Sequence, residues 1–514
     1  MIFSKSVNRY YLKYWYFYVL GIISLFIVDI SGSIIPPKVI ANIIGALKDG
    51  TMTSEFLRKE LLILVVCLLC TFTFRFLWRI GFFTASHKIG HDIRRRLFQK
   101  SLTLSQTFYS DNKVGGLMSY YINDVQSIKE SFGWGMMEFF DTIFLIPLVL
   151  IQMFQINWLV TLFTFIPLSI ICVGSLIVEK YTEAKYKERQ DSFETLSDFT
   201  QESFSGIRVI KAFVREAKEL KDFNKKNKDN ERVNINYLKL SIMFNTVIDF
   251  FIWTIYFLIV ILGAYFVVAK PMIKAKDLVE FVSYFDTLIW PMFAIGEIVN
   301  MRSRGMASLR RCEEILYAES DLIEAENPIR ITDDFKGNIK FNHLTFKFPD
   351  SKDINALNDV SFEIKPGEFI GIIGKTGSSK TTLVNLLLRI YNVDRGEILI
   401  DDEDIMDYSI KDIRSLIGYV PQDNFLYSQT IESNIAFSSD IIDKEKVEKE
   451  AMIAGVHTDI IGFPKGYKTK LGERGVSVSG GQKQRISIAR ALYKNPKILI
   501  LDDSLSAVDT KTES

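Results

Sequence analysis

Long apolar stretches without charge occupy much of the first three hundred residues, and short apolar runs between turns occupy the rest. The longest stretch, Thr142 to Val178, has 37 residues without a charged side chain. A helix crosses a bilayer with about 20 residues, so this stretch predicts two spans hinged near Gln152, Gln155 and Asn157. The whole pattern predicts six spans, at about 14–37, 57–80, 132–153, 157–178, 245–269 and 278–300.

Lys and Arg are unevenly distributed among the segments that join these spans. Segments 75–130 and 179–242 hold nine and fourteen, whereas 45–60, 152–157 and 270–277 hold three, none and three. Cytoplasmic connections carry the excess of Lys and Arg, so the two basic segments and both chain termini are predicted to be cytoplasmic.

The two basic connectors are rich in charge and favour helix. Structureless loops of such length are uncommon, so the membrane helices are expected to continue well into the cytoplasm. The helical pattern breaks at Tyr109–Gly116 in the first connector and at Gln201–Arg208 in the second. These two turn elements are either plain helix corners or contacts to a cytoplasmic domain.

Composition and charge narrow the choice of partners. The chain has 514 residues, 48% of them hydrophobic, and 62 Lys and Arg against 61 Asp and Glu, a net charge of +1. Such a balance gives no overall field for nucleic acid, which is not expected as a partner. The cysteines fit no secreted disulfide framework, and a Cys67–Cys70 redox pair is disfavoured. They are interpreted as buried apolar side chains: Cys67, Cys70, Cys172 and Cys312.

Several acids lie at or near the predicted depth of the lipid: Asp29, Glu138, Asp141, Asp249 and Glu297. Charged groups there are costly and are functional candidates by default. They would suit an outward-moving cationic substrate. Alternatively, several of them lie at cytoplasmic helix ends or pair with neighbours.

After about Gly337 the pattern changes to short strands separated by turns. Three such strands are predicted, at Asn338–Phe341, Leu344–Phe348 and Phe369–Ile373. The last one leads into a glycine loop and then an apolar helix, Leu383–Ile390. The loop residues are Gly374, Lys375, Thr376, Gly377, Ser378, Ser379, Lys380, Thr381 and Thr382. In this context a P-loop is expected, with Lys380 neutralising phosphates and Thr381 ligating Mg²⁺.

One position departs from the P-loop pattern, and a second element compensates for it. Ser379 stands where a glycine is expected and would crowd the phosphates or strain the turn by roughly 1 to 3 kcal/mol. Lys497–Asp503 is an apolar strand ending in two carboxylates. Asp502 would hold Mg²⁺ through water and Asp503 would polarise the attacking water, or the strand has merely a solvated acidic end.

A second potential phosphate cradle precedes that strand. The residues Val478, Ser479, Gly480, Gly481 and Gln482 open a helix with backbone donors, a hydroxyl and no bulky side chain. One subunit rarely needs two cradles so far apart in sequence. This one is therefore interpreted as serving an ATP bound to another subunit.

Together these motifs resemble those of the ABC exporters over essentially the whole chain. The resemblance implies that Val478–Gln482 is the signature motif, with Val in place of the usual Leu. It implies that Phe348 stacks on adenine in place of Tyr. It also implies that Gln422, in the run Tyr419–Gln422, contacts Mg²⁺ and reports to the membrane domain.

The resemblance extends to the elements that link the two domains. Gly206–Phe213 is similar to the second intracellular loop of an exporter, which makes both turn elements candidates for coupling helices. Glu473–Gly475 resembles the stretch near the coupling elements, and Ser506–Asp509 resembles the loop that contacts the other ATP-binding domain.

Three departures from the family pattern concern the ATP site. Ser379 replaces Gly, Asp503 replaces the catalytic Glu, and no histidine follows Asp502. The four histidines are His87, His91, His343 and His457. The family's switch histidine and final strands are thus expected to be missing, leaving an incomplete C-terminus. Aspartate falls about 1 Å short of a water positioned for glutamate, which costs roughly a hundredfold in rate. Similar substitutions mark the degenerate site of heterodimeric multidrug exporters, so a heterodimer is expected over a homodimer.

The expected fold is a six-span membrane helical bundle of ABC exporter type fused to an α/β P-loop NTPase domain. Its boundaries are 1–320 for the membrane domain, 321–337 for a linker and 338–514 for the ATP-binding domain. The expected function is ATP-driven export of lipophilic or cationic small molecules or lipids by alternating access, in a bacterial plasma membrane, with ATP and Mg²⁺ as cofactors. A nucleotide-binding but non-hydrolysing regulatory subunit, or an inactive remnant, is the alternative.

Overall fold

The structure is a computed structural model that describes residues 5–112, 114–269, 272–331, 335–349, 351, 354–472, 475 and 478–503. The chain divides into two compact units. The first comprises Met1–Phe98 and Met118–Leu316, and the second comprises Gln99–Leu117 and Tyr317–Ser514. The first unit is helical and the second is α/β.

Long helices dominate the first unit. Its elements are α1 (Lys5–Val28), the π-helical turn η1 (Asp29–Ile34), α2 (Ile35–Lys48), α3 (Ser54–Ser101), η2 (Tyr120–Asp124), α6 (Val125–Glu130), η3 (Ser131–Gly135), α7 (Met136–Ile156), α8 (Trp158–Ser205), α9 (Ile207–Ala212), α10 (Glu216–Val268) and α11 (Ala275–Tyr317). Helices α3 and α8 have 48 residues each and α10 has 53. At about 1.5 Å per residue they far exceed the roughly 30 Å of hydrocarbon in a bilayer.

Five helical segments of the described chain are long and apolar enough to cross a membrane. They are Asn8–Lys48, Ser54–Ser101, Gly115–Ile156, Glu216–Val268 and Ala275–Tyr317. Five of the six predicted spans fall within these segments. The fourth, at 157–178, falls in α8, where a shorter apolar helix covers Trp158–Gly174. The count of six spans therefore stays a prediction.

A single residue joins α7 to α8. The Asn157 side chain is buried, and its Oδ1 accepts hydrogen bonds from the backbone N–H groups of Leu159 at 3.0 Å and Val160 at 3.1 Å. This is an N-cap, which satisfies helix donors that would otherwise have no partner. The hinge predicted within the longest uncharged stretch is thus a one-residue turn at Asn157.

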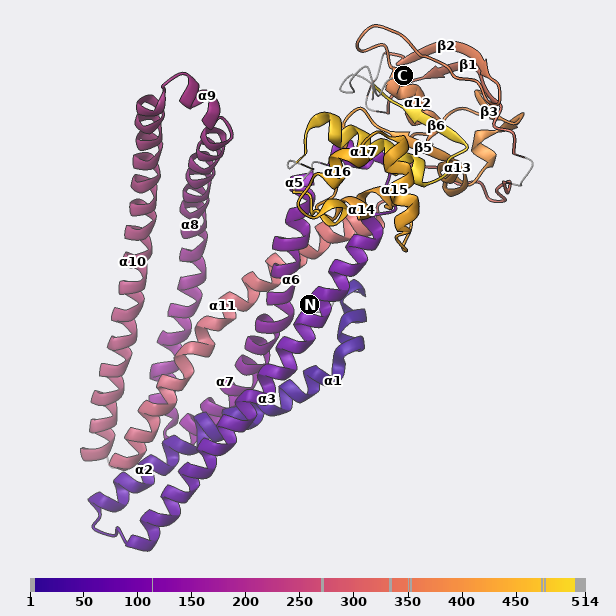
Figure 1. Ribbon diagram of the computed structural model, residues 1–514. Helices are drawn as coiled ribbons and strands as arrows, with labels where there is room; N and C mark the ends of the chain where they lie inside the picture. Colours follow the sequence, from indigo (N-terminus) through magenta and orange to yellow (C-terminus); the bar gives the residue numbers. More distant parts are fainter. Residues whose placement is uncertain are drawn as a thin grey trace. The chain divides into compact units, whose positions relative to one another are not determined.

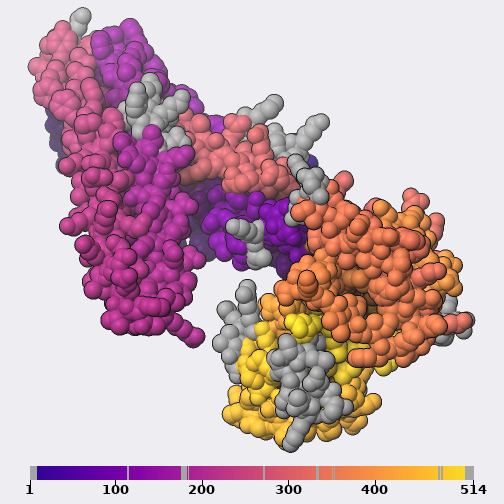
Figure 2. Space-filling view, turned by 90° about the horizontal axis from the view of Figure 1, so that it is seen from above, coloured from indigo at the N-terminus to yellow at the C-terminus, as the bar shows by residue number. Residues whose placement is uncertain are grey.

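Helices α8 and α10 form a long antiparallel hairpin closed by α9 (Figure 1). The two helices pack against each other along their length, and their surface is the magenta block of Figure 2. At the closed end, Val209 and Phe213 are 60% and 73% exposed. The second predicted turn element, Gln201–Arg208, lies at this apolar and exposed tip.

Helices α1 and α3 approach each other closely at a pair of glycines. A Cβ on Gly81 would lie 2.7 Å from the carbonyl oxygen of Phe17 and 2.8 Å from the Cα of Gly21. Only glycine permits this backbone contact, which is typical of membrane helix pairs. Beyond the crossing, α1 runs beside the half of α3 that carries its basic residues.

Two sheets form the second unit (Figure 1). The antiparallel sheet has the order β2-β1-β3-β4, with β1 (Ile339–Phe346), β2 (Leu357–Ile364), β3 (Ile398–Ile400) and β4 (Glu403–Asp404). The other sheet pairs β5 (Ile417–Val420) with β6 (Ile498–Leu501) in parallel. The helices are α4 (Gln106–Asp111), α5 (Val114–Ser119), α12 (Lys380–Leu387), α13 (Ile410–Leu416), α14 (Ile431–Ile435), α15 (Lys444–Ile453), α16 (His457–Ile461) and α17 (Gly480–Tyr493).

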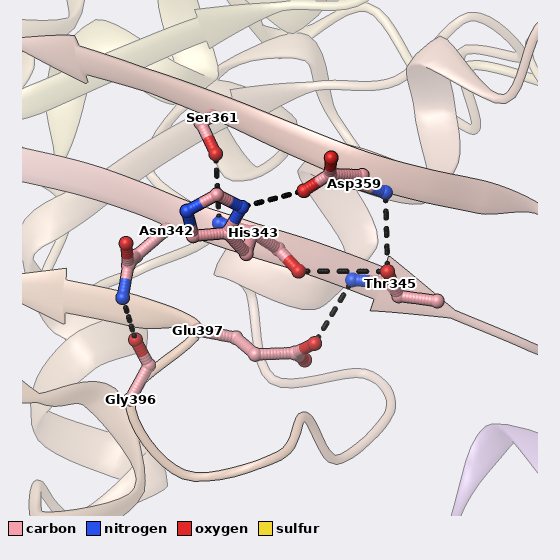
Figure 3. A network of polar contacts seen from close by, with 7 residues as sticks. All are labelled: Asn342, His343, Thr345, Asp359, Ser361, Gly396 and Glu397. Carbon is pink, nitrogen blue, oxygen red and sulfur yellow. Dashed lines mark hydrogen bonds and ion pairs between the residues drawn. The ribbon is translucent and has the colours of Figure 1, made fainter.

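The first two predicted strands are one strand, β1, with a bulge at His343. The pairing with β2 shifts register between Phe341 and Leu344, and His343 has a φ of 52°. Side chains take over the hydrogen bonding at the bulge, as Figure 3 shows: Ser361 Oγ accepts from the His343 backbone N–H at 2.8 Å. The His343 ring lies 2.6 Å from an Asp359 carboxylate oxygen. The break in the apolar pattern was a bulge and not a turn between strands.

The third predicted strand, Phe369–Ile373, is wrong. The structure places this segment in neither sheet, and Phe369 and Ile373 are 95% and 97% exposed. An extended run becomes a strand only when another strand pairs with its backbone groups. Here β6 pairs with β5, and no strand of the described chain pairs with residues 369–373. The helix after the loop also differs from its prediction, since α12 begins at Lys380 and ends at Leu387.

A segment from the first basic connector belongs to the second unit. Residues Gln99–Leu117 group with the chain after Tyr317. The Thr107 hydroxyl donates a hydrogen bond to Asp321 Oδ2 at 2.8 Å, and Leu104 and Ser105 are buried. The first turn element, Tyr109–Gly116, falls in this segment, although its Lys113 lies outside the described residues. The element thus lies next to residues that contact the second unit, and its role in coupling stays a prediction.

Candidate functional site

The glycine loop leads directly into α12. Lys380 is the first residue of the helix, and its ammonium group donates hydrogen bonds to the carbonyl oxygens of Gly374 at 2.9 Å and Lys375 at 3.0 Å. The side chain thus curls back over its own loop. A Cβ on Gly374 would lie 2.6 Å from Ser378 Oγ, so a larger residue there would displace the Ser378 side chain. The Lys380 ammonium and the N-terminus of α12 both place positive charge at this loop, which suits an anion.

Ser379 adopts the left-handed conformation that the expected glycine would adopt freely. Its φ and ψ are 63° and 28°. For a residue with a Cβ this conformation costs roughly 1 to 2 kcal/mol. The strain predicted for this position therefore lies in the backbone of the residue immediately before Lys380.

Parallel pairing brings the two acidic residues and Gln422 to one edge of a sheet. Val420 of β5 pairs with Leu501 of β6, so the residues that follow both strands meet beyond their carboxyl ends. There the Gln422 side-chain amide donates a hydrogen bond to Asp503 Oδ2 at 3.1 Å. The structure thus joins two residues that the sequence places 81 positions apart.

Asp502 has the features of a cation ligand. Its Oδ2 is buried and accepts no hydrogen bond from the residues that the structure describes. The Tyr419 side chain is a neighbour: burial and the Asp502 carboxylate raise the pKa of Tyr419 to about 12. The phenol therefore remains protonated and available as a donor to Asp502. A buried carboxylate oxygen with spare acceptor capacity fits Mg²⁺ or a water of its hydration shell.

The N-terminus of α17 is rigid and open. Ser479 Oγ accepts from the Gln482 backbone N–H at 3.3 Å, while Gln482 Oε1 accepts from the Ser479 N–H at 3.1 Å. This capping box holds both residues in place. A Cβ on Gly480 would meet no atom of the described residues within 4 Å, so the space beside Gly480 is open as far as the structure describes the chain.

Asp459 of α16 supports this helix end. The Asp459 carboxylate accepts a hydrogen bond from Gln482 Nε2 at 3.2 Å and forms an ion pair with Arg485 at 2.7 Å. Sequence reasoning missed Asp459, which belongs to no motif, and it missed the contact of Tyr419 with Asp502, because both act through contacts made by the fold. Among the described residues, no hydrogen bond or ion pair joins Ser479–Gln482 to the loop Gly374–Thr382.

Phe348 lies at the edge of an aromatic group. Its ring is half-buried and makes edge-to-face contacts with Phe346 at 5.2 Å and Tyr391 at 5.5 Å between centroids. Such contacts fix the orientation of the ring. The predicted coupling and dimer-contact residues Glu473, Arg474 and Ser506–Asp509 lie outside the described residues.

Acids also come together in the first unit. The carboxyl groups of Asp29 in η1 and Asp141 in α7 lie close to each other. Glu138 is buried and accepts from Trp134 Nε1 at 2.7 Å, and Glu297 lies near it. Asp29 Oδ2 and Glu138 Oε2 have no hydrogen-bond partner among the described residues. Asp249 is exposed and lies apart from this group.

Comparison with known families decides the class of the protein. The family described as "ABC transporter transmembrane region" matches residues 17–292, more than half of the chain, and "ABC transporter" matches residues 357–506. The chain belongs to the ABC transporter family. It is an ATPase-coupled transporter that crosses the membrane several times.

Similar bacterial proteins carry both domains in the same order. The chain is 37% identical over 517 residues to the probable multidrug resistance ABC transporter ATP-binding/permease protein YheI of Bacillus subtilis (strain 168), covering 99% of this chain and 86% of that protein. It is 32% identical to the multidrug resistance-like ATP-binding protein MdlA of Escherichia coli (strain K12), covering 99% of this chain and 85% of that protein. This ABC transporter subunit is thus similar to both over nearly its whole length.

Proposed function

We propose that this chain is one half of a dimeric ABC exporter that moves lipophilic or cationic small molecules outward, and that its own ATP site turns over slowly. The contact between Gln422 and Asp503 carries the proposal. It joins a predicted Mg²⁺ ligand to the residue at the position of the catalytic acid, and that residue is aspartate where the family has the longer glutamate. The proposed domains are a six-span membrane domain over 1–320, a linker over 321–337 and an ATP-binding domain over 338–514.

The loop Gly374–Thr382 and the edge of the parallel sheet would together bind Mg-ATP. The loop N–H groups and Lys380 would hold the phosphates, and Phe348 would stack on the base. Mg²⁺ would be held by the Thr381 hydroxyl, Gln422 and the free oxygen of Asp502, where it neutralises phosphate charge. The remaining loop contacts would come from Gly374, Lys375, Thr376, Gly377, Ser378, Ser379 and Thr382.

The slow turnover follows from the distance between the Asp503 carboxylate and the water that it would activate. Asp503 is one methylene shorter than glutamate, and its carboxylate accepts from Gln422 at 3.1 Å. An oxygen held about 1 Å from the optimal position for activating water costs roughly a hundredfold in rate. The strained Ser379 beside the phosphates adds to the effect.

The open N-terminus of α17 would serve a partner subunit. Ser479, Gly480, Gly481 and Gln482 would face a nucleotide held by the other half-transporter, in a site that this chain completes. The exposed apolar tip at α9 offers a surface for coupling to an ATP-binding domain, and the Gln99–Leu117 segment offers the other. A heterodimer is favoured, since a partner with an intact catalytic acid would supply the hydrolysis that Asp503 does not.

The substrate class rests on the carboxyl groups of the membrane unit. Asp29 and Glu138 each place a buried oxygen without a hydrogen-bond partner among the described apolar helices, with Asp141 beside Asp29, and a positive charge would be attracted there. The names of the similar proteins YheI and MdlA refer to multidrug resistance, which agrees with lipophilic cations as substrates.

The test is to purify the chain alone and together with a co-expressed second half-transporter, and to measure ATP binding, hydrolysis and efflux of a cationic dye from proteoliposomes. Binding is expected in both samples and is lost with Lys380→Ala. Rapid hydrolysis is expected only in the pair, where Asp503→Asn changes it little and Ser479→Ala lowers it at least tenfold.

Rapid hydrolysis by the chain alone that is abolished by Asp503→Asn would contradict the slow site and favour a homodimer. ATP binding without hydrolysis in any pairing would instead support the regulatory, non-hydrolysing alternative.

A further inference from the structure

A basic groove lies between α1 and α3 in the first unit. It encloses about 720 Å³, and its lining includes Tyr14 of α1 and, on α3, Phe83 and the basic side chains Arg79, His87, Lys88 and His91. No acidic side chain lines it. Nothing in the transport cycle described above uses this groove.

The basic side chains of the groove are not neutralised by protein acids. Within the described residues, neither Arg79 nor Lys88 has a carboxylate within 4.0 Å. Aromatic rings hold them instead: the Arg79 guanidinium lies 5.5 Å from the Trp78 ring centre, and the Lys88 ammonium lies 4.6 Å from that of Phe17. Contacts with ring faces leave the N–H groups free to bind an anion.

The nearest carboxylate is already occupied. Asp92 forms an ion pair with Lys13 and accepts a hydrogen bond from the Tyr14 hydroxyl at 2.9 Å. His91 and Arg95 lie 3.9 Å and 4.0 Å from the same group. The groove therefore keeps a net positive charge.

The position of the groove along α3 points to the membrane surface. Arg79 lies at the predicted cytoplasmic end of the second span, and the other basic residues follow on the next turns. In the opposite direction the same helix face is apolar and open, with Phe72 and Phe76 exposed by 76% and 64%. At 3.6 residues per turn, Phe72, Phe76, Arg79 and Phe83 lie within about 60° of one another around α3, so a lipid-facing apolar strip leads to Arg79.

We propose that this groove binds the phosphate headgroup of an anionic phospholipid of the cytoplasmic leaflet. The headgroup phosphate is held by Arg79, Lys88 adds positive charge further along the groove, and the acyl chains lie along Phe72 and Phe76. Basic pockets at the cytoplasmic ends of membrane helices suit such headgroups. A bound lipid there links α1 to α3 beyond their glycine crossing.

The experiment measures binding of a short-chain phosphatidylglycerol, with phosphatidylcholine and inorganic phosphate as comparisons, to the purified full-length chain in a neutral detergent. The double variant Arg79→Gln/Lys88→Gln is expected to bind phosphatidylglycerol about thirtyfold more weakly, at roughly a fivefold loss for each basic side chain near the surface. Phosphatidylcholine binding is expected to remain unchanged. The charge-conserving variant Arg79→Lys/Lys88→Arg is expected to keep most of the affinity, which separates charge from folding.

A matched control removes the same charge at the other end of α3. Arg58→Gln/Lys59→Gln is expected to leave phosphatidylglycerol binding unchanged. An equal loss in this control, or no loss in the groove variant, would overturn the proposal. Competition by inorganic phosphate at concentrations equal to those of the lipid would show that the groove binds a free anion and not a lipid, and would also overturn it.

Discussion

Two non-glycine residues of the ATP-binding unit have a positive φ beside its proposed phosphate and metal ligands. Ser379 has a φ of 63° and Asp503 a φ of 50°. A Cβ makes this region unfavourable, although short polar side chains tolerate it better than others. Both deviations from the family pattern thus lie at points where the backbone is already constrained.

Replacing Ser379 by glycine is expected to stabilise the chain. The left-handed backbone costs roughly 1 to 2 kcal/mol for serine, and the greater freedom of unfolded glycine offsets about 0.5 to 1 kcal/mol of the gain. Ser379→Gly should therefore raise the free energy of unfolding by about 0.5 to 1 kcal/mol and strengthen ATP binding. Thermal unfolding and binding of a fluorescent ATP analogue check this.

The adjacent serine provides the control. Ser378 does not have a positive φ, so Ser378→Gly gains no relief and should lower stability by about 0.5 to 1 kcal/mol. Equal effects of the two substitutions would rule out backbone strain as the explanation.

At the scale of elements, motifs in the sequence identified helix ends and loops more reliably than strands. Ser479 was placed correctly at a helix start, because capping signals are local, and the helix after the glycine loop was found although it begins three residues earlier than predicted, at Lys380. The Phe369–Ile373 run was misread as a strand, since pairing depends on a partner elsewhere in the chain. The bulge at His343 was misread for the same reason, as its register is set by β2.

The orientation of α17 depends on α16, a helix that no sequence motif predicted. Asp459 of α16 holds both Gln482 and Arg485. Asp459→Ala should lower the free energy of unfolding by about 1 to 3 kcal/mol, because Arg485 loses its charged partner. It should also reduce hydrolysis by a pair of half-transporters, since Gln482 is no longer fixed. Thermal unfolding and ATPase assays measure the two effects.

The exposed Asp440 serves as the comparison for this change. Asp440→Ala removes the same charge from the surface of the same unit and should change stability by less than about 0.5 kcal/mol. A hydrolysis rate unaffected by Asp459→Ala would show that α16 does not position the α17 end.

At the scale of the whole molecule, the distribution of Lys and Arg predicts which turns face the cytoplasm. In a form without its four cysteines, Thr51→Cys at the turn between α2 and α3 should react with a membrane-impermeant maleimide in intact cells. Phe213→Cys, at the α9 tip, should react only after the cells are permeabilised, because the basic connectors stay inside. The cysteine-free form provides the background, and the reverse labelling pattern would contradict the orientation.

The general plan of the molecule was predictable, and its division into units was not. Long uncharged runs indicated the membrane helices, and ordered motifs indicated the ATPase. The membership of Gln99–Leu117 in the second unit was not predictable, because its contact between Thr107 and Asp321 spans 214 positions.

That long-range contact also has a consequence for synthesis. Ribosomes add about 5 to 20 residues per second, so the 214 residues between Thr107 and Asp321 take roughly 10 to 40 s to appear. During that interval Thr107 has no Asp321 to bond to. The second unit therefore cannot assemble when Gln99–Leu117 is synthesised. This segment can join the unit only after the chain beyond Tyr317 has been made.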